Sequence, residues 1–525
     1  MFKNLRGENQ KRDKVIKIVI TILLLLLPFL DMLRTTNIRN FEILGISIIE
    51  IWNILLIGVA FLLTLFKCKW KELLFVFGYL IVLGIYIVFH FKHIITFDTS
   101  LFPRADFNFV TETFYIGRVY ILPLALLFVL IKNKDIFNKE FYFKIIKIVI
   151  AIISFSIIIL NVLKLSFISY SDTHDFNIRN IFDYFLFQGD FRQLSSRGWF
   201  DSANELSAIM FMLFPINLYL LFKEGKKSNV ALFVGQFIAM ILLGTRTSAV
   251  GSVLIVLAVG FLYFIFVLTR TEILKVNFTK IFVFCSLICI AFFSVSPFMI
   301  ARLNEGKADF SVKNQEAYDE LEDDKNDPEK MSELFKKYRD EYMINELFLE
   351  IYPYEVDPDF WLQMASRDKF LNNDSRRMKS DILARVKERS NNSADTYLGL
   401  GYTLNMIDGE RDYTYQYYLF GIVGIIVLMG PYFGILIYLI AKCLFNLKKC
   451  FKLNVACSLM GIVLGLLIAY YSGHVFGWVS PMMWLVVMLS LGVYIVLENC
   501  SKKEKEIKSE KENDKKTLDK FLKSI

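Results

Sequence analysis

Residues 15–33 read VIKIVITILLLLLPFLDML, and only Lys17, Thr21, Pro28 and Asp31 interrupt the apolar side chains. A helix needs about 20 mostly apolar residues to cross the hydrocarbon core of a bilayer, so this stretch is long enough to span a membrane. A signal peptide would be followed by a small-residue cleavage site, and none follows this run. We therefore expect it to be retained as a first transmembrane helix.

The composition of the whole chain leads to the same class of protein. Of the 525 residues, 55% are apolar, and the mean hydropathy is +0.46. A water-soluble core of ordinary size could not bury this much apolar surface. The formal net charge is +8, but the lysines occur in short clusters between apolar runs. We interpret the clusters as topology signals and expect no nucleic-acid partner.

The apolar runs predict an all-α integral membrane protein with about twelve transmembrane helices. The clusters from Lys67 to Lys71, from Lys132 to Lys144 and from Lys442 to Lys452 fall on alternate connections, as the positive-inside rule requires if both termini are cytoplasmic. We therefore expect a multi-pass protein of the cytoplasmic (inner) membrane. The predicted spans lie near residues 15–33, 41–66, 70–91, 114–131, 145–168, 199–222, 228–244, 247–268, 279–300, 415–441, 453–473 and 475–497.

The chain divides into four predicted regions. Residues 1–300 form the first nine spans, residues 301–414 a large, mostly helical extracytoplasmic loop, residues 415–497 the last three spans and residues 498–525 a charged cytoplasmic tail. Long loops often carry function. Helical spacing of apolar and charged residues at 331–350 and 378–387 predicts short amphipathic helices lying over the membrane surface.

Polar residues gather at the predicted extracytoplasmic ends of the spans. Arg197 precedes the sixth span, in which Asn204 and Glu205 would be costly if they faced lipid. Arg246 stands in the very short turn Gly244-Thr245-Arg246-Thr247-Ser248. It could be a cation that anchors a helix end at the interface, or it could bind phosphate, because a guanidinium matches phosphate oxygens in bidentate geometry.

Further candidates follow in the loop and in the last spans. Arg367 and Arg376 are either phosphate ligands or solvated surface charges. Glu410 and Asp412 stand where the loop re-enters the membrane, where a carboxylate could act as general base or pair with Arg411.

His474 lies between the last two spans, on the same predicted face. It is either structural or a base that takes a proton from a hydroxyl near pH 7. A membrane site with arginines, carboxylates and a histidine suits a lipid-linked phosphate or diphosphate.

At the same segments the chain resembles the O-antigen ligase and polymerase family of bacterial membrane glycosyltransferases. The likeness covers roughly residues 195 to 485, by the order and spacing of several short motifs. These motifs are Gly198-Trp199-Phe200-Asp201-Ser202-Ala203-Asn204-Glu205 with Pro215, Gly244-Thr245-Arg246-Thr247-Ser248, Ser366-Arg367-Asp368, Gly399-Leu400-Gly401-Tyr402, Glu410-Arg411-Asp412 with Gly421 and Gly424, and Gly473-His474 with Pro481.

The resemblance implies a GT-C-like fold, an all-helical membrane fold of glycosyltransferases that use lipid-linked sugars. It also implies transfer of oligosaccharide from undecaprenyl diphosphate to an acceptor, with no metal or other cofactor. Arg246 and Arg367 would bind the diphosphate, helped by Arg376, and Glu410 or His474 would take the proton of the acceptor hydroxyl. The implied partners are the lipid-linked oligosaccharide, membrane lipid, a flippase and a chain-length regulator.

Within this family we favour a polymerase that adds one lipid-linked repeat unit to another in cell-surface polysaccharide synthesis. Ligases of the family often carry a catalytic histidine in the large loop, and residues 302–413 contain no histidine. The alternatives are an O-antigen ligase, a flippase of lipid-linked oligosaccharide, a peptidoglycan-type polymerase and a non-catalytic scaffold. A flippase should show internal repeats and broken helices near the midplane, and the sequence has no recognisable repeat.

Overall fold

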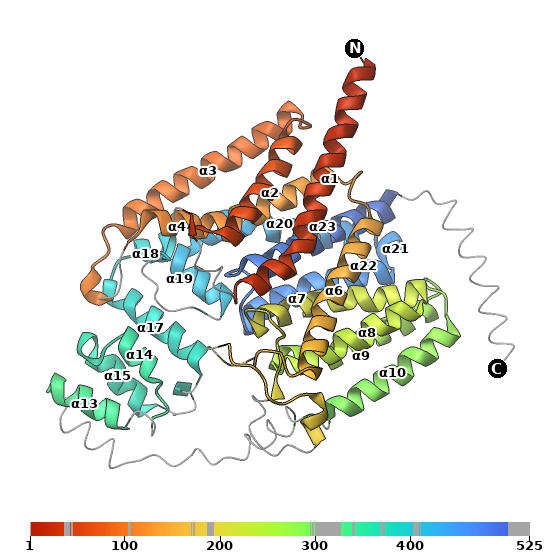
Figure 1. Ribbon diagram of the computed structural model, residues 1–525. Coiled ribbons are helices and arrows are strands. Elements are labelled where there is room, and N and C mark those ends of the chain that lie inside the picture. The colour runs from red at the N-terminus through yellow and green to blue at the C-terminus, as the bar shows by residue number, and fades with distance from the viewer. Residues whose placement is uncertain are drawn as a thin grey trace.

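The computed structural model describes residues 2–35, 42–43, 46–102, 107–169, 171, 174–185, 194–294, 296, 299, 327–338, 342–367, 371–372, 374–402, 409 and 411–501. These residues are almost entirely helical (Figure 1). They also include a two-stranded antiparallel hairpin, in which β1 (Glu42–Ile43) pairs with β2 (Ile46–Ser47), and an isolated antiparallel bridge between Phe167 and Phe176. The predicted span at 41–66 therefore begins later, at Ile48, where Ser47 caps the helix by accepting the N–H of Glu50.

Eleven helices of the described chain are long and apolar enough to cross a membrane, which confirms a polytopic all-α membrane protein. The predicted span at 228–244 corresponds to α8, which is apolar but only 16 residues long and so is not among the eleven. The span-length helices are α1 (Phe2–Leu33), α2 (Ile48–Leu65), α3 (Trp70–Ile94), α4 with α5 (Phe109–Ile116 and Leu122–Lys132), α6 (Lys139–Val162), α7 (Ala203–Glu224), α9 (Arg246–Leu268), α10 (Val276–Ser294), α19 with α20 (Asp412–Gly424 and Gly430–Phe445), α22 (Leu453–Tyr471) and α23 (Val479–Ser501), and α8 is Lys227–Leu242.

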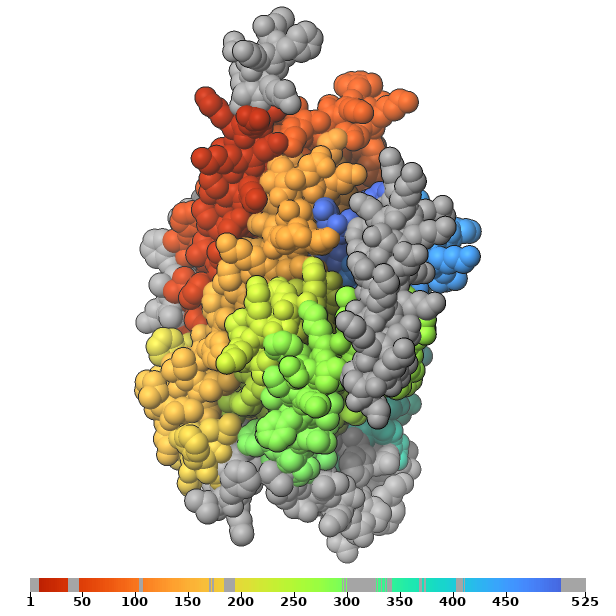
Figure 2. Space-filling view, turned by 90° about the vertical axis from the view of Figure 1, so that its right-hand side faces the viewer, coloured from red at the N-terminus to blue at the C-terminus, as the bar shows by residue number. Residues whose placement is uncertain are grey.

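Two helices, α7 and α23, form the centre of the bundle. In its most apolar window α7 is buried completely, and 94% of that of α23 is buried. The side chains of both helices therefore pack against neighbouring helices of the bundle. By contrast, α3 and α10 are only 17% buried and lie at the periphery, and Figure 2 shows α10, in green, at the surface.

Polar contacts tie both ends of α2 to neighbouring helices. At one end, Lys67 bonds to Asp13 and to Asn133, at 2.6 and 2.7 Å. At the other end, Arg118 bonds to Glu50 at 2.6 Å. The first end carries the lysines that the positive-inside rule assigns to the cytoplasm.

Two spans are interrupted by π-helical turns, η3 (Gly117–Ile121) between α4 and α5 and η7 (Ile425–Met429) between α19 and α20. Just before η7, Gly421 leaves the helical conformation with φ +65°. The freed carbonyls of Tyr418 and Leu419 accept the N–H groups of Leu400 and Gly401, at 2.7 and 2.8 Å. The glycine motif of the loop thus docks on the kink of α19.

The large loop has a hydrophobic core of its own, built by α13 (Pro328–Tyr338), α14 (Glu346–Ile351), α15 (Pro358–Ser366) and α17 (Ser375–Ser390). Trp361 is fully buried at its centre and donates its indole N–H to the carbonyl of Tyr352 at 3.0 Å. Ile94 and Phe102, at the end of α3 and just beyond it, join this core. The expectation of separate helices lying over the membrane surface was therefore incomplete, because their apolar faces pack against one another.

Shorter elements complete the described chain. They are η2 (Thr99–Leu101), η4 (Ile181–Phe185), η6 (Tyr354–Val356), α18 (Ala394–Leu398) and α21 (Leu447–Cys450). Figure 1 shows α13, α14, α15 and α17 together at the lower left, beside α18 and α19.

Candidate functional site

The turn between α22 and α23 has an unusual backbone that one carboxylate holds in place. Gly473 and His474 both have positive φ, +69° and +68°. Asp412, the first residue of α19, accepts the N–H groups of His474 at 3.0 Å and of Val475 and Phe476 at 2.7 Å each. Its side chain is almost fully buried. Asp412 therefore fixes the turn that carries the predicted histidine.

The ring of His474 is held in a defined orientation. Its Nδ1 lies 3.0 Å from the carbonyl oxygen of Ser472, and the ring stacks on Trp478 with centroids 5.7 Å apart. A carbonyl oxygen can only accept, so Nδ1 carries the proton and the neutral ring has its lone pair on Nε2. This tautomer can take a proton from a hydroxyl.

Arg246 is the first residue of α9, directly after the capping residue Thr245. The neighbouring Thr247 donates to Ser472 at 3.4 Å, which brings the start of α9 to the turn that contains His474. The side chain of Arg246 is exposed and makes no hydrogen bond or ion pair with any described residue. A helix N-terminus also favours anions, through its free N–H groups and its dipole. An anion bound at the start of α9 would be stabilised both by the guanidinium of Arg246 and by the N-terminus of the helix.

The start of α7 contains three more predicted residues. Arg197 is buried and donates to the carbonyls of Ser169 and Ser171, at 3.4 and 3.0 Å, so it braces the preceding loop. Asn204 is half-buried in the first turn of α7. Glu205 is 1% exposed and lies 3.6 Å from the guanidinium of Arg34.

Arg34 was not among the predicted site residues, yet it holds the end of α1 against α7. Burial opposes its charge, but Glu205 and Asp31 outweigh that effect and raise the pKa of Arg34 above its ordinary value. The ion pair between Glu205 and Arg34 thus links the end of α1 to the start of α7.

The arginines of the large loop differ in how far they are engaged. Arg367 bonds to Asn372 and Asp381, both at 2.5 Å, so it would have to exchange these contacts for a phosphate. Arg376 is half-buried in the first turn of α17. The capping residue of that helix, Asp374, accepts from Arg411 at 3.2 Å, beside Asp412. Arg376 therefore starts a helix that is tied to the start of α19, whereas Glu410 lies outside the described residues.

A buried polar cluster between α3, α4 and α18 was not predicted from the sequence. His90 and Glu112 are both fully buried, and their side chains meet at 3.0 Å. His90 also contacts the carbonyl of Leu398, while Glu112 accepts the N–H of Tyr402. One turn further along α3, His93 pairs with Asp395 at 2.6 Å.

The signal that could have found this cluster is the presence of ionisable residues within apolar spans, which is costly unless they are paired. The same signal marks Glu50 and Arg118. The cluster joins α3 and α4 to the segment that follows α18.

The arrangement offers an unengaged guanidinium at a helix N-terminus and an oriented imidazole on adjoining helix ends. Among the described residues, no group of three or more His, Cys, Asp or Glu side chains could hold a metal ion. A cavity of about 360 Å³ lies between α9 and α10, but its lining includes none of the predicted site residues. The site is therefore defined by helix ends that contact one another.

Comparison with known protein families matches residues 13–499 to the family described as O-antigen ligase like membrane protein. No match was found among curated proteins or among solved structures. The matched region includes every predicted site residue and nearly all the described helices. The chain thus belongs to the O-antigen ligase-like family of membrane proteins, whose role is in cell-surface glycan assembly.

Proposed function

We propose that the chain is a polysaccharide polymerase that transfers oligosaccharide from undecaprenyl diphosphate to a lipid-linked acceptor repeat unit. The reaction takes place at the outer face of the cytoplasmic membrane, where a flippase supplies the units and a chain-length regulator acts on the product. The observation that carries the proposal is the exposed Arg246 at the start of α9, next to the turn of His474. Family membership supports a glycan-transferring activity.

The proposed reaction needs a cation for the diphosphate and a base for the acceptor. Arg246 binds phosphate oxygens in bidentate fashion and stabilises the charge that develops on the leaving group. Nε2 of His474 takes the proton of the acceptor hydroxyl as its oxygen attacks the anomeric carbon. A new C–O bond forms and the bond between the anomeric carbon and the diphosphate breaks. The bonding electron pair leaves with undecaprenyl diphosphate.

Other predicted residues have supporting roles in this proposal. Asp412 is a positioning residue, because its carboxylate holds the backbone of the turn and is already bonded to three N–H groups. Glu410 is the alternative base. Arg376 and, after exchange of its present contacts, Arg367 add positive charge from the loop, and Arg197 maintains the loop before α7.

The test uses the full chain in detergent with lipid-diphosphate-linked oligosaccharides from its own host. Wild type should produce a ladder of longer lipid-linked glycans, and Arg246→Ala should abolish the ladder. Lys92→Ala is the matched control, because Lys92 is an exposed cation at the same end of the bundle. The control should keep wild-type activity.

Three outcomes contradict the polymerase proposal. Transfer of finished glycan to another acceptor, with no ladder, would show a ligase. Movement of a single unit across a liposome bilayer without elongation would show a flippase. A ladder that persists unchanged in Arg246→Ala would exclude the arginine from the reaction.

A further inference from the structure

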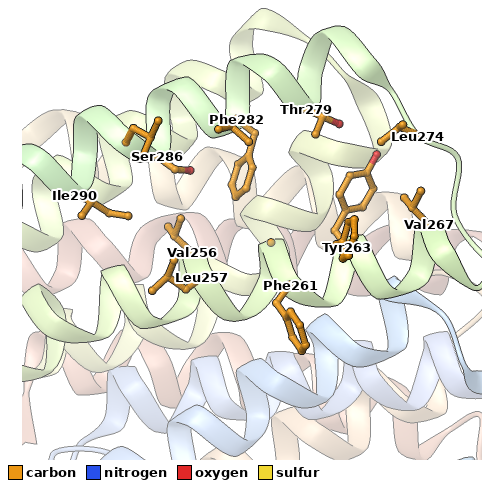
Figure 3. Close-up of a pocket in the computed structure, with 14 residues that line it drawn as sticks. Val256, Leu257, Phe261, Tyr263, Val267, Leu274, Thr279, Phe282, Ser286 and Ile290 are labelled. Carbon is orange, nitrogen blue, oxygen red and sulfur yellow. The ribbon is translucent and has the colours of Figure 1, made fainter. Parts of the chain in front are cut away.

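The cavity between α9 and α10 has a shape and a chemical character that the proposed reaction does not explain. It lies along the outer side of α9, and its lining runs from Val256 to Val267 on that helix and from Thr279 to Ile290 on α10 (Figure 3). Leu257 and Phe264, both more than half exposed, form part of this lining. The cavity is thus a groove that opens toward the surrounding membrane.

The lining is mostly apolar, and two of its three hydroxyl groups are already hydrogen-bonded. The hydroxyl of Tyr263 bonds to the carbonyl of Ile273 at 3.1 Å and also accepts the N–H of Lys275. The hydroxyl of Thr279 donates to the carbonyl of Lys275 at 3.0 Å. These two hydroxyls are already used by the backbone of the connection. The hydroxyl of Ser286, also in the lining, is buried and has no hydrogen-bond partner among the described residues, so a polar ligand would find one available hydroxyl in an otherwise apolar groove.

Aromatic contacts hold the walls of the groove in place. Phe222 of α7 stacks on Tyr263, with ring centroids 4.0 Å apart, and meets the ring of Phe282 edge-on at 4.8 Å. Figure 3 shows Phe282 pointing from α10 toward α9. A Cβ on Gly260 would lie 3.1 Å from the ring of Phe282, so the two helices approach closely there. The groove is therefore preformed.

The length of the groove matches one leaflet of a bilayer. From Val256 to Val267 a helix rises about 16 Å, at 1.5 Å per residue. Half of the hydrocarbon core is about 15 Å thick. The groove therefore fits a single acyl chain. A polyprenyl chain whose diphosphate is bound at Arg246 would begin ten residues before Val256, which is about 15 Å along α9 from the near end of the groove.

The charge at one end of the groove indicates which lipid supplies that chain. The connection after α9 and the first turns of α10, residues 270–280, contain three basic residues, Arg270, Lys275 and Lys280, and one acidic residue, Glu272, an excess of two positive charges. Arg270 and Lys280 are exposed, and their side chains have no partner among the described residues. Basic groups next to a groove between transmembrane helices suit an anionic headgroup.

We propose that the groove between α9 and α10 binds an acyl chain of an anionic phospholipid, with its headgroup at Arg270 and Lys280. By the positive-inside rule this lipid belongs to the cytoplasmic leaflet. Because only 17% of α10 is buried, the bound chain fills space between α10 and the rest of the bundle. This lipid site is separate from the site at Arg246 and does not depend on the reaction proposed there.

The test is photolabelling of the full chain in detergent with phosphatidylglycerol that carries a diazirine in its acyl chain. Labelled peptides should come from α9 and α10, and phosphatidylcholine with the same chains should label them at least several-fold less. Arg270→Gln with Lys280→Gln should reduce labelling roughly 10- to 30-fold, because each basic group near a membrane surface contributes to binding of anionic lipid. The matched control is Lys69→Gln with Lys71→Gln, which removes two exposed cations at the same end of the bundle.

A second pair of variants tests the groove itself. Ser286→Phe fills it, since Ser286 is part of the lining, and should abolish labelling of α9 and α10. Ser294→Phe places the same side chain at an exposed position of α10 outside the lining and should label like wild type. Equal labelling by the two lipids, labelling elsewhere in the chain, or displacement by polyprenyl phosphate but not by unlabelled phosphatidylglycerol would each overturn the proposal.

Discussion

The carboxylate of Asp412 accepts the backbone N–H of His474 at 3.0 Å, although the two residues lie 62 positions apart in the chain. The same carboxylate accepts the next two N–H groups, so one side chain determines the path of the turn before α23. A turn with two successive positive φ angles is strained for a non-glycine residue, and such strain persists only where the surroundings enforce it. The orientation of His474 therefore depends on Asp412.

Replacement of Asp412 should reduce stability and activity together. Asp412→Ala leaves three buried N–H groups without their acceptor, at about 1–3 kcal/mol each, so we expect a loss of at least about 3 kcal/mol in unfolding free energy. Asp412→Asn keeps one acceptor oxygen and should fall between alanine and wild type in both properties. Asp359→Ala is the control, because Asp359 makes no hydrogen bond to a described residue through its side chain. If Asp412 were itself the base, asparagine would be as inactive as alanine while remaining nearly as stable as wild type.

Arg246 should contribute to ligand binding and not to folding. Hydrogen bonds to charged groups are worth about 1.5–3 kcal/mol, so Arg246→Ala should weaken binding of a polyprenyl diphosphate about 10- to 100-fold. Arg246→Lys keeps the charge but loses the bidentate geometry and should recover part of the affinity. Titration of the detergent-solubilised variants with the lipid, alongside thermal unfolding, measures both properties. A fall in unfolding temperature equal to that of Asp412→Ala would mean that Arg246 is structural.

The core of the large loop should lose stability in acid through Asp357. Burial would raise the pKa of this carboxyl, but hydrogen bonds from Arg385 and Tyr352 outweigh it, so the pKa lies below its ordinary value of 3.8. A lowered pKa in the folded state means that the stabilisation is complete above pH 3.8 and is lost as the pH falls through the folded value. Amide hydrogen exchange in α15 and α17 should therefore accelerate below about pH 4.

A variant separates this effect from general acid unfolding. Arg385→Gln removes the main partner of Asp357, because Nε of Arg385 donates to the carboxylate of Asp357 at 2.7 Å. The variant should exchange faster than wild type at neutral pH and show a smaller further change in acid. An acid response as large as that of wild type would assign the effect to other carboxylates.

The spans were predictable because hydropathy over about 20 residues is a local property. The apolar faces of α13 and α17 were also visible in the sequence, but a pattern of apolar residues does not say whether it meets lipid or another helix. The same limit applies to Asp412. Its position at the start of a span was clear, whereas its use by three N–H groups depends on a turn 62 residues away. His90 and Glu112 escaped for the same reason, since their pairing joins α3 to α4.

The kink of α19 gives a final prediction from two glycines in one span. At Gly421, φ is +65° and an added Cβ would lie 2.4 Å from the carbonyl carbon of Tyr397. Gly421→Ala should therefore reduce the unfolding free energy by at least about 2 kcal/mol. It should also loosen the segment at Leu400 and Gly401, which is hydrogen-bonded to the kink. Gly434, within α20, has nothing within 4 Å of such a Cβ. Gly434→Ala should therefore be neutral or stabilise the chain by up to about 1 kcal/mol, because alanine favours the helix. Thermal unfolding of both variants in one detergent compares them directly, and equal effects would show that the kink at Gly421 is not needed for the fold.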